Sequence, residues 1–112
     1  MTRWILVTHD STIQTKDGPQ RDVHKHLGGP LTFVGAIPSL DAVVLSRLDS
    51  ENLPAHDWNG CPFFLDDLTV RGCIAIVSSN EDGGEQDLDV NEFLSLLGDR
   101  TGTGTGYRYR LE

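Results

Sequence analysis

Carboxylates are concentrated in residues 80–89, where five acidic side chains fall within nine consecutive positions. Closely spaced oxygen ligands are typical of calcium loops, but their order here does not fit an EF-hand, which needs ligands at fixed positions around a central glycine. Either a solvated turn or an acidic face that attracts a basic partner fits the pattern. The candidate residues of this acidic face are Glu81, Asp82, Glu85, Asp87 and Asp89.

A second pattern, at residues 107–110, alternates aromatic and basic side chains. Arginine can pair with a phosphate, and tyrosine or tryptophan can stack on a base or a cation. The pattern therefore gives an alternative function, a nucleotide-binding or nucleotide-sequestering protein that acts as an oligomer. The candidate residues of this alternative are Tyr107, Arg108, Tyr109, Arg110 and Trp58.

The tetrapeptide Thr8-His9-Asp10-Ser11 contains the side-chain types of a serine hydrolase triad. A triad requires these groups to converge in space, whereas neighbours at the end of a strand point in different directions. The chain also has no Gly-x-Ser-x-Gly elbow. We expect a polar turn here, no catalytic residue and no enzymatic activity, with a small hydrolase or metalloenzyme ranked last.

Histidine and cysteine spacing does not favour a metal site. His24 and His26 are two positions apart, which does not place them on one helix face. Cys61 and Cys73 form no Cys-x-x-Cys pair, and Cys73 lies in an apolar run typical of a buried, inert thiol. We therefore expect no metal ligand and no cofactor.

The formal net charge is −8, and it is unevenly distributed. Residues 1–48 carry five basic and four acidic side chains, whereas residues 49–112 carry four basic and thirteen acidic ones. This balance argues against direct nucleic-acid binding and against docking to an anionic membrane, because both depend on cationic side chains. The only short apolar stretch near the start is too short for a signal peptide or a membrane span, which predicts a cytoplasmic protein.

The chain length of 112 residues predicts a single domain over residues 1–100. Residues 101–112 then form a Thr-Gly-rich linker and a short strand or tail. Apolar, β-prone runs predict strands at residues 4–8, 12–15, 31–37, 42–48 and 71–79, with a four-residue loop joining the third and fourth strands. Residues 53–65 are expected to be a loop with its aromatic groups on the core.

Two helices are expected. Pro19 and Gly28 delimit a short one, because proline suits the first helical position and glycine the left-handed C-terminal cap. Asp89 and Glu92 form a capping-box pattern before a second helix that ends at Gly98. Because short loops favour antiparallel pairing, the fold class is α+β, a mainly antiparallel sheet of four to six strands with two helices packed on one face.

Several of these features together resemble a family of small uncharacterised domains in phage and plasmid accessory genes, over about residues 13–97. The features are Leu27-Gly28-Gly29 at a helix end, a strand at residues 41–48, Leu53-Pro54, a loop with Asn59, and the strand at residues 72–77 before an acidic turn and a helix. Pro30 and the bulky Asp57-Trp58-Asn59 depart from the family pattern. The family has no established catalytic residues, so the resemblance implies only a setting, a mobile-element protein that acts on host machinery.

The first functional hypothesis is therefore a non-enzymatic interaction protein. Its acidic face would bind a basic surface of a host protein that handles nucleic acid or serves in defence, and the binding would weaken with salt. A homodimer is also expected to be possible, because exposed sheet edges of small domains often pair between subunits.

Overall fold

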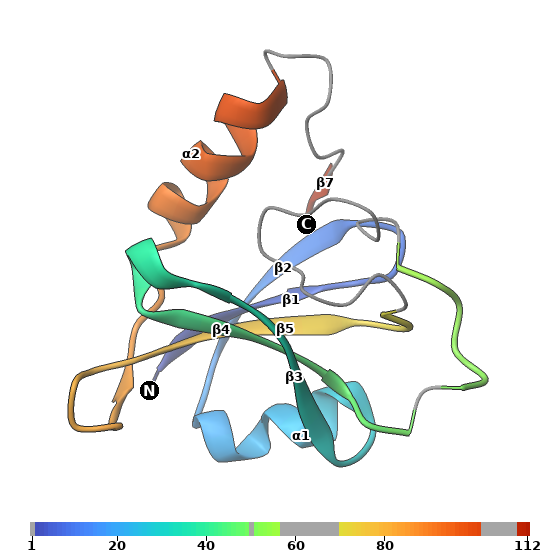
Figure 1. The fold of residues 1–112 in the computed structure, drawn as a ribbon. Helices are drawn as coiled ribbons and strands as arrows, with labels where there is room; N and C mark the ends of the chain where they lie inside the picture. The colour runs from blue at the N-terminus through green and yellow to red at the C-terminus, as the bar shows by residue number, and fades with distance from the viewer. Residues whose placement is uncertain (1, 50, 57–69, 102–109) are drawn as a thin grey trace.

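The computed structural model describes residues 2–49, 51–56, 70–101 and 110–112. Seven strands and two α-helices are present in this part of the chain, together with two short 3-10 turns (Figure 1). The strands are β1 (Arg3–Val7), β2 (Thr12–Asp17), β3 (Leu31–Ile37), β4 (Ala42–Arg47), β5 (Ile74–Ser79), β6 (Glu85–Gln86) and β7 (Arg110–Leu111). The helices are α1 (Val23–Leu27) and α2 (Val90–Thr101), and the 3-10 turns are η1 (Gln20–Asp22) and η2 (Pro38–Leu40).

The strands form one sheet in the order β3-β4-β5-β1-β2-β7, and β6 pairs with the end of β5. Strands β1 to β6 pair antiparallel, while the two-residue β7 lies parallel to β2. The α+β fold class and the mainly antiparallel sheet are therefore confirmed. The expected hairpin is confirmed as well, since η2 joins β3 to β4.

The two helices cover opposite faces of the sheet, so the expectation that both pack on one face is wrong (Figure 1). Ile5 and Val7 point into a cluster with Phe93 of α2, whereas Trp4 and Leu6 point into a cluster with Val23 and Leu27 of α1. The physical reason is that β1 and β5 are apolar at consecutive positions and not at alternate ones. Such strands must be covered on both faces.

The short helix α1 follows its sequence signals closely. Pro19 precedes η1, which continues into α1, and Gly28 takes the left-handed conformation (φ 94°) expected of the cap. The Gly28 N–H donates to the carbonyl oxygen of His24 at 2.9 Å. A Cβ at this position would be strained whatever the space around it.

The second helix begins where its capping pattern predicts. The Glu92 N–H donates to Oδ1 of Asp89 at 3.0 Å, which confirms Asp89 as the N-cap. The predicted stop at Gly98 is wrong, because α2 continues to Thr101. A single glycine inside a helix costs only about 1 kcal/mol relative to alanine, so it does not end a helix by itself.

Parts of the predicted structure lie outside the described residues, namely most of the loop at residues 53–65 and residues 102–109 of the Thr-Gly-rich stretch. Beyond them, β7 returns to the sheet, where Ile13 of β2 is the register partner of Leu111. No helix in the described part of the chain has both the length and the apolar character needed to cross a membrane.

Phe93 is fully buried and holds α2 against the sheet. We expect Phe93→Ala to lower the free energy of unfolding by about 3–5 kcal/mol, because it removes a large core side chain and leaves a cavity. Urea unfolding followed by circular dichroism measures this change. The control is Ser95→Ala on the exposed side of the same helix, expected within about 0.5 kcal/mol of the parent. A loss below about 1 kcal/mol for Phe93→Ala would contradict the packing.

Candidate functional site: the acidic segment

Residues 80–92, named here the acidic segment, lead from the end of β5 through a turn and β6 into the first turn of α2. They contain six carboxylates and no lysine, arginine or histidine, so this segment alone carries −6 of the net charge of −8. All six acidic residues are exposed in the structure. They are the five predicted residues Glu81, Asp82, Glu85, Asp87 and Asp89, with Glu92 in addition.

Asn80 fixes the turn at the start of the acidic segment. Its side-chain oxygen accepts the N–H groups of Asp82 at 3.0 Å and Gly84 at 2.8 Å. Its own main-chain N–H donates to the carbonyl of Gly84, and the Gly83 N–H donates back to the carbonyl of Asn80. Gly83 has φ 82°, a conformation that favours glycine. Glu81 and Asp82 therefore sit on a turn of defined shape.

Three of the carboxylates accept hydrogen bonds from main-chain amides. Asp87 Oδ1 accepts the Arg3 N–H at 2.7 Å, and Glu85 Oε1 accepts the Gln20 N–H. Asp89 accepts at the start of α2, as described above. A main-chain amide is neutral, so it fixes the direction of a carboxylate without cancelling its charge.

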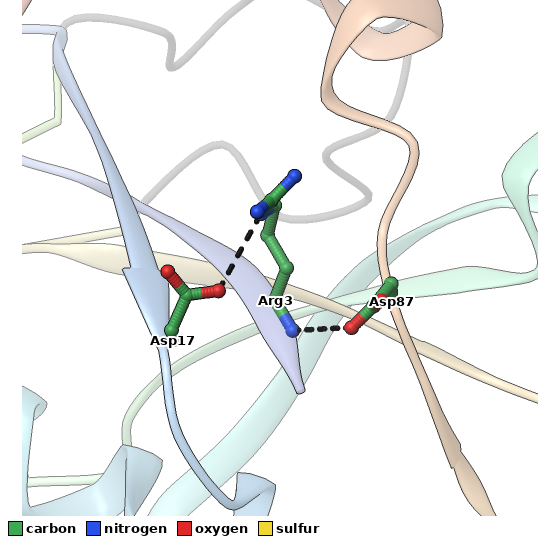
Figure 2. A network of polar contacts seen from close by, with 3 residues as sticks. All are labelled: Arg3, Asp17 and Asp87. Carbon is green, nitrogen blue, oxygen red and sulfur yellow. Dashed lines mark hydrogen bonds and ion pairs between the residues drawn. The ribbon is translucent and has the colours of Figure 1, made fainter. Parts of the chain in front are cut away.

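The side chain of Arg3, a residue in contact with Asp87, does not neutralise the acidic segment (Figure 2). Its main-chain N–H contacts Asp87, but its guanidinium Nε lies 3.4 Å from Oδ1 of Asp17 on β2. The other ion pair in the described part of the chain joins Lys25 and Asp22. Among the described residues, then, the carboxylates of the acidic segment form no ion pair.

Ser78 ties the base of the acidic segment to the core. Its buried hydroxyl donates to the carbonyl of Leu40 at 2.9 Å and accepts from Nε2 of Gln86 at 2.8 Å. The Gln20 side chain donates to the Ser78 carbonyl at 2.6 Å. The sequence did not predict a positioning role for these residues or for Asn80. The one available signal was a pair of serines at the end of an otherwise apolar strand.

Most of the second candidate set falls outside the part of the chain that the structure describes. Residues Trp58, Tyr107, Arg108 and Tyr109 lie outside the described residues, and Arg110 is the first residue of β7.

The residues at positions 8–11 form a tight polar turn between β1 and β2. The Thr8 hydroxyl donates to the carboxylate of Asp10, and the Ser11 hydroxyl donates to the Asp10 carbonyl at 2.6 Å. Ser11 has φ 65°, an uncommon value for a residue other than glycine. The serine hydroxyl is thus engaged with the main chain, which is the arrangement of a turn.

A shallow hollow of about 300 Å³ lies beside this turn, lined in part by His9, Asp10, Cys73 and Glu112. Cys73 is half-buried, not fully buried as expected. Burial raises the pKa of the Cys73 thiol, a hydrogen bond with the main chain of His9 lowers it, and the negative charge of Asp10 raises it further, for a net increase. A thiol that stays protonated is a poor nucleophile.

The histidines of α1 do not converge on a common ligand. His24 and His26 are both exposed, and the ring of His26 meets the buried ring of Trp4 edge-on at 5.1 Å between centroids. No group of three or more histidine, cysteine, aspartate or glutamate side chains in the described ranges is arranged to hold a metal ion.

Comparison with known proteins identifies the family. The model of a family of unknown function, DUF5880, matches residues 6–96, so the chain belongs to this family. The match begins within β1 and runs through β2, α1, β3, β4, β5 and the acidic segment into α2. It shows an uncharacterised family and no phage or plasmid setting. No curated protein and no solved structure matches the chain.

The raised pKa of Cys73 predicts that its thiol becomes reactive only at a higher pH than an ordinary cysteine. In a Cys61→Ser background, the alkylation rate of the native protein by iodoacetamide should rise at higher pH than that of the same protein in denaturant, because less thiolate is present when the chain is folded. Mass spectrometry of quenched samples gives the rate at each pH and so the pH at which the rate is half its maximum. This midpoint does not depend on how accessible the thiol is, because accessibility scales the rate at every pH alike. A native midpoint at or below the denatured one would contradict the prediction.

Proposed function

We propose that the chain is a non-enzymatic interaction protein that binds a basic surface of another protein through the acidic segment. The observation that carries the proposal is a set of six exposed carboxylates, three of them bonded to neutral amides, with no ion pair among the described residues. Charge arranged in this way is available to a partner in the free protein.

Fixed carboxylates favour binding for two reasons. Side chains that are already held lose less conformational freedom on association, so more of the attraction remains as affinity. A concentrated negative field also speeds the encounter with a cationic surface. Both effects weaken as salt shortens the range of the field.

The resemblance noted above extends the proposal to a setting. A protein that handles nucleic acid presents basic side chains where the phosphates bind. A compact acidic segment competes for such a surface, which suits a phage or plasmid accessory protein that inhibits a host nucleic-acid-handling or defence protein in the cytoplasm. No contact among the described residues favours the nucleotide-binding alternative, which stays a prediction.

The proposal predicts that charge removal at the tip of the turn weakens binding to a cationic probe. We expect Glu81→Gln with Asp82→Asn to lower the affinity for a fluorescent octalysine peptide about fivefold, because two exposed ion pairs contribute about 1 kcal/mol together. Fluorescence anisotropy at low salt measures this affinity. The affinity of the parent protein should be lower when the measurement is repeated at high salt, because salt screens the charges.

The matched control is Asp49→Asn with Glu51→Gln, which removes two exposed charges in another turn. The control should bind nearly as tightly as the parent. Equal losses in the two double variants would show that only net charge matters and would contradict a site at the acidic segment. Binding insensitive to salt would contradict the electrostatic basis.

A further inference from the structure

Strand β3 is an open edge of the sheet. It pairs with β4 on one side, from Leu31 opposite Arg47 to Ile37 opposite Ala42, and no strand of the described ranges pairs with its other side (Figure 1). An exposed edge presents unpaired main-chain donors and acceptors, and proteins usually protect such edges with charges, prolines or a covering segment.

The two edges of the sheet differ in this protection. On the far side, β2 carries Lys16 and Asp17, and β7 covers the start of that strand at Thr12 and Ile13. On the near side, β3 has the sequence Leu-Thr-Phe-Val-Gly-Ala-Ile, with no charged residue and no proline. Its one irregularity is a bulge between Phe33 and Gly35, which leaves a regular stretch on each side.

An apolar surface continues from this edge onto one face of the sheet. Phe33 is 73% exposed, the highest value among the exposed large hydrophobic residues of the described chain. Its register partner, Leu45, packs against the cluster beneath α1, so Phe33 lies on the α1 face. Ala36 lies on the same face, opposite Val43, and is also exposed. The five-residue α1 leaves both side chains uncovered.

We infer that this edge pairs with the same edge of a second copy, so that two β3 strands join the sheets of two chains across a two-fold axis. Such an interface is isologous, with the same surface on each side. The two strands supply each other's missing hydrogen bonds. A two-fold axis normal to the sheet places the α1 faces of the two copies on the same side of the joined sheet. Each Phe33 therefore lies beside the α1 face of the other copy, along the seam where the two β3 strands pair, and is partly covered there.

The charge distribution of the molecule is compatible with a second copy. The segment that follows β6 lies beside β1, because the Leu88 N–H donates to the carbonyl of Arg3. β4 therefore separates β3 from the start of the acidic segment at the end of β5, about 10 Å away at the usual strand spacing, and β4 and β5 together separate it from β6, about 15 Å away. The acidic segments of two copies joined at β3 lie farther apart than either distance. Since the Debye length is about 8 Å at physiological salt, repulsion between the acidic segments of two copies is largely screened.

This inference does not rest on the proposed function, and it is tested by the mass of the protein in solution. Sedimentation equilibrium over micromolar to millimolar concentrations should give a mass that doubles from 12.3 kDa. Phe33→Lys should weaken self-association at least tenfold, because it places a charge on each side of the seam. The control is Leu111→Lys, at a side chain of similar exposure (62%) on the opposite edge, which should associate like the parent.

Hydrogen exchange of the parent protein provides a second measurement that needs no variant. The β3 amides should exchange more slowly at high than at low protein concentration, while the amides of β2 do not change. A parent protein of constant 12.3 kDa mass would overturn the inference. So would association that Leu111→Lys abolishes and Phe33→Lys does not.

Discussion

The structure depends on a central strand that is buried on both faces. In β5, Ile74 to Ser78 are all buried, so neither face of the strand can be left to solvent. Antiparallel neighbours satisfy its main-chain groups, and α1 and α2 supply the cover, one on each side. A domain of this size buries a limited apolar surface, so it depends on keeping both faces of β5 covered. The polar parts of the chain must therefore begin where β5 ends.

β5 ends at Ser78 and Ser79, and the acidic segment follows directly from these two residues. The Ser78 hydroxyl meets a carbonyl of η2 and the side chain of Gln86, so the start of the segment is fixed to the interior. Farther along, Asp87 and Asp89 serve the fold through amide contacts while their charge stays in solvent. These two carboxylates thus hold the acidic segment in place and also contribute to its negative field. Replacement of each aspartate by asparagine separates the two roles, because the amide oxygen still accepts a hydrogen bond but carries no charge.

Sequence reasoning predicted the elements better than their arrangement. Local signals sufficed for the Gly28 cap and the Asp89 N-cap, because both depend on a few neighbouring residues. The placement of α1 and α2 on opposite faces depends on which strands lie beside β1 and β5. That pairing is set by the whole sheet and not by neighbouring residues in the sequence. The exposure of the predicted acidic residues followed from their charge, but the amide partners in Arg3 and Gln20 are distant in sequence and left no local signal.

The central claim is that a negative field is concentrated over the acidic segment in the free protein. Solvent paramagnetic relaxation in nuclear magnetic resonance tests it directly, by comparing a cationic with an anionic nitroxide cosolute residue by residue. The account predicts the largest ratio of cationic to anionic effect at residues 80–92 and a ratio that falls as salt is added. A ratio that is uniform over the surface, or largest at another segment, would contradict it.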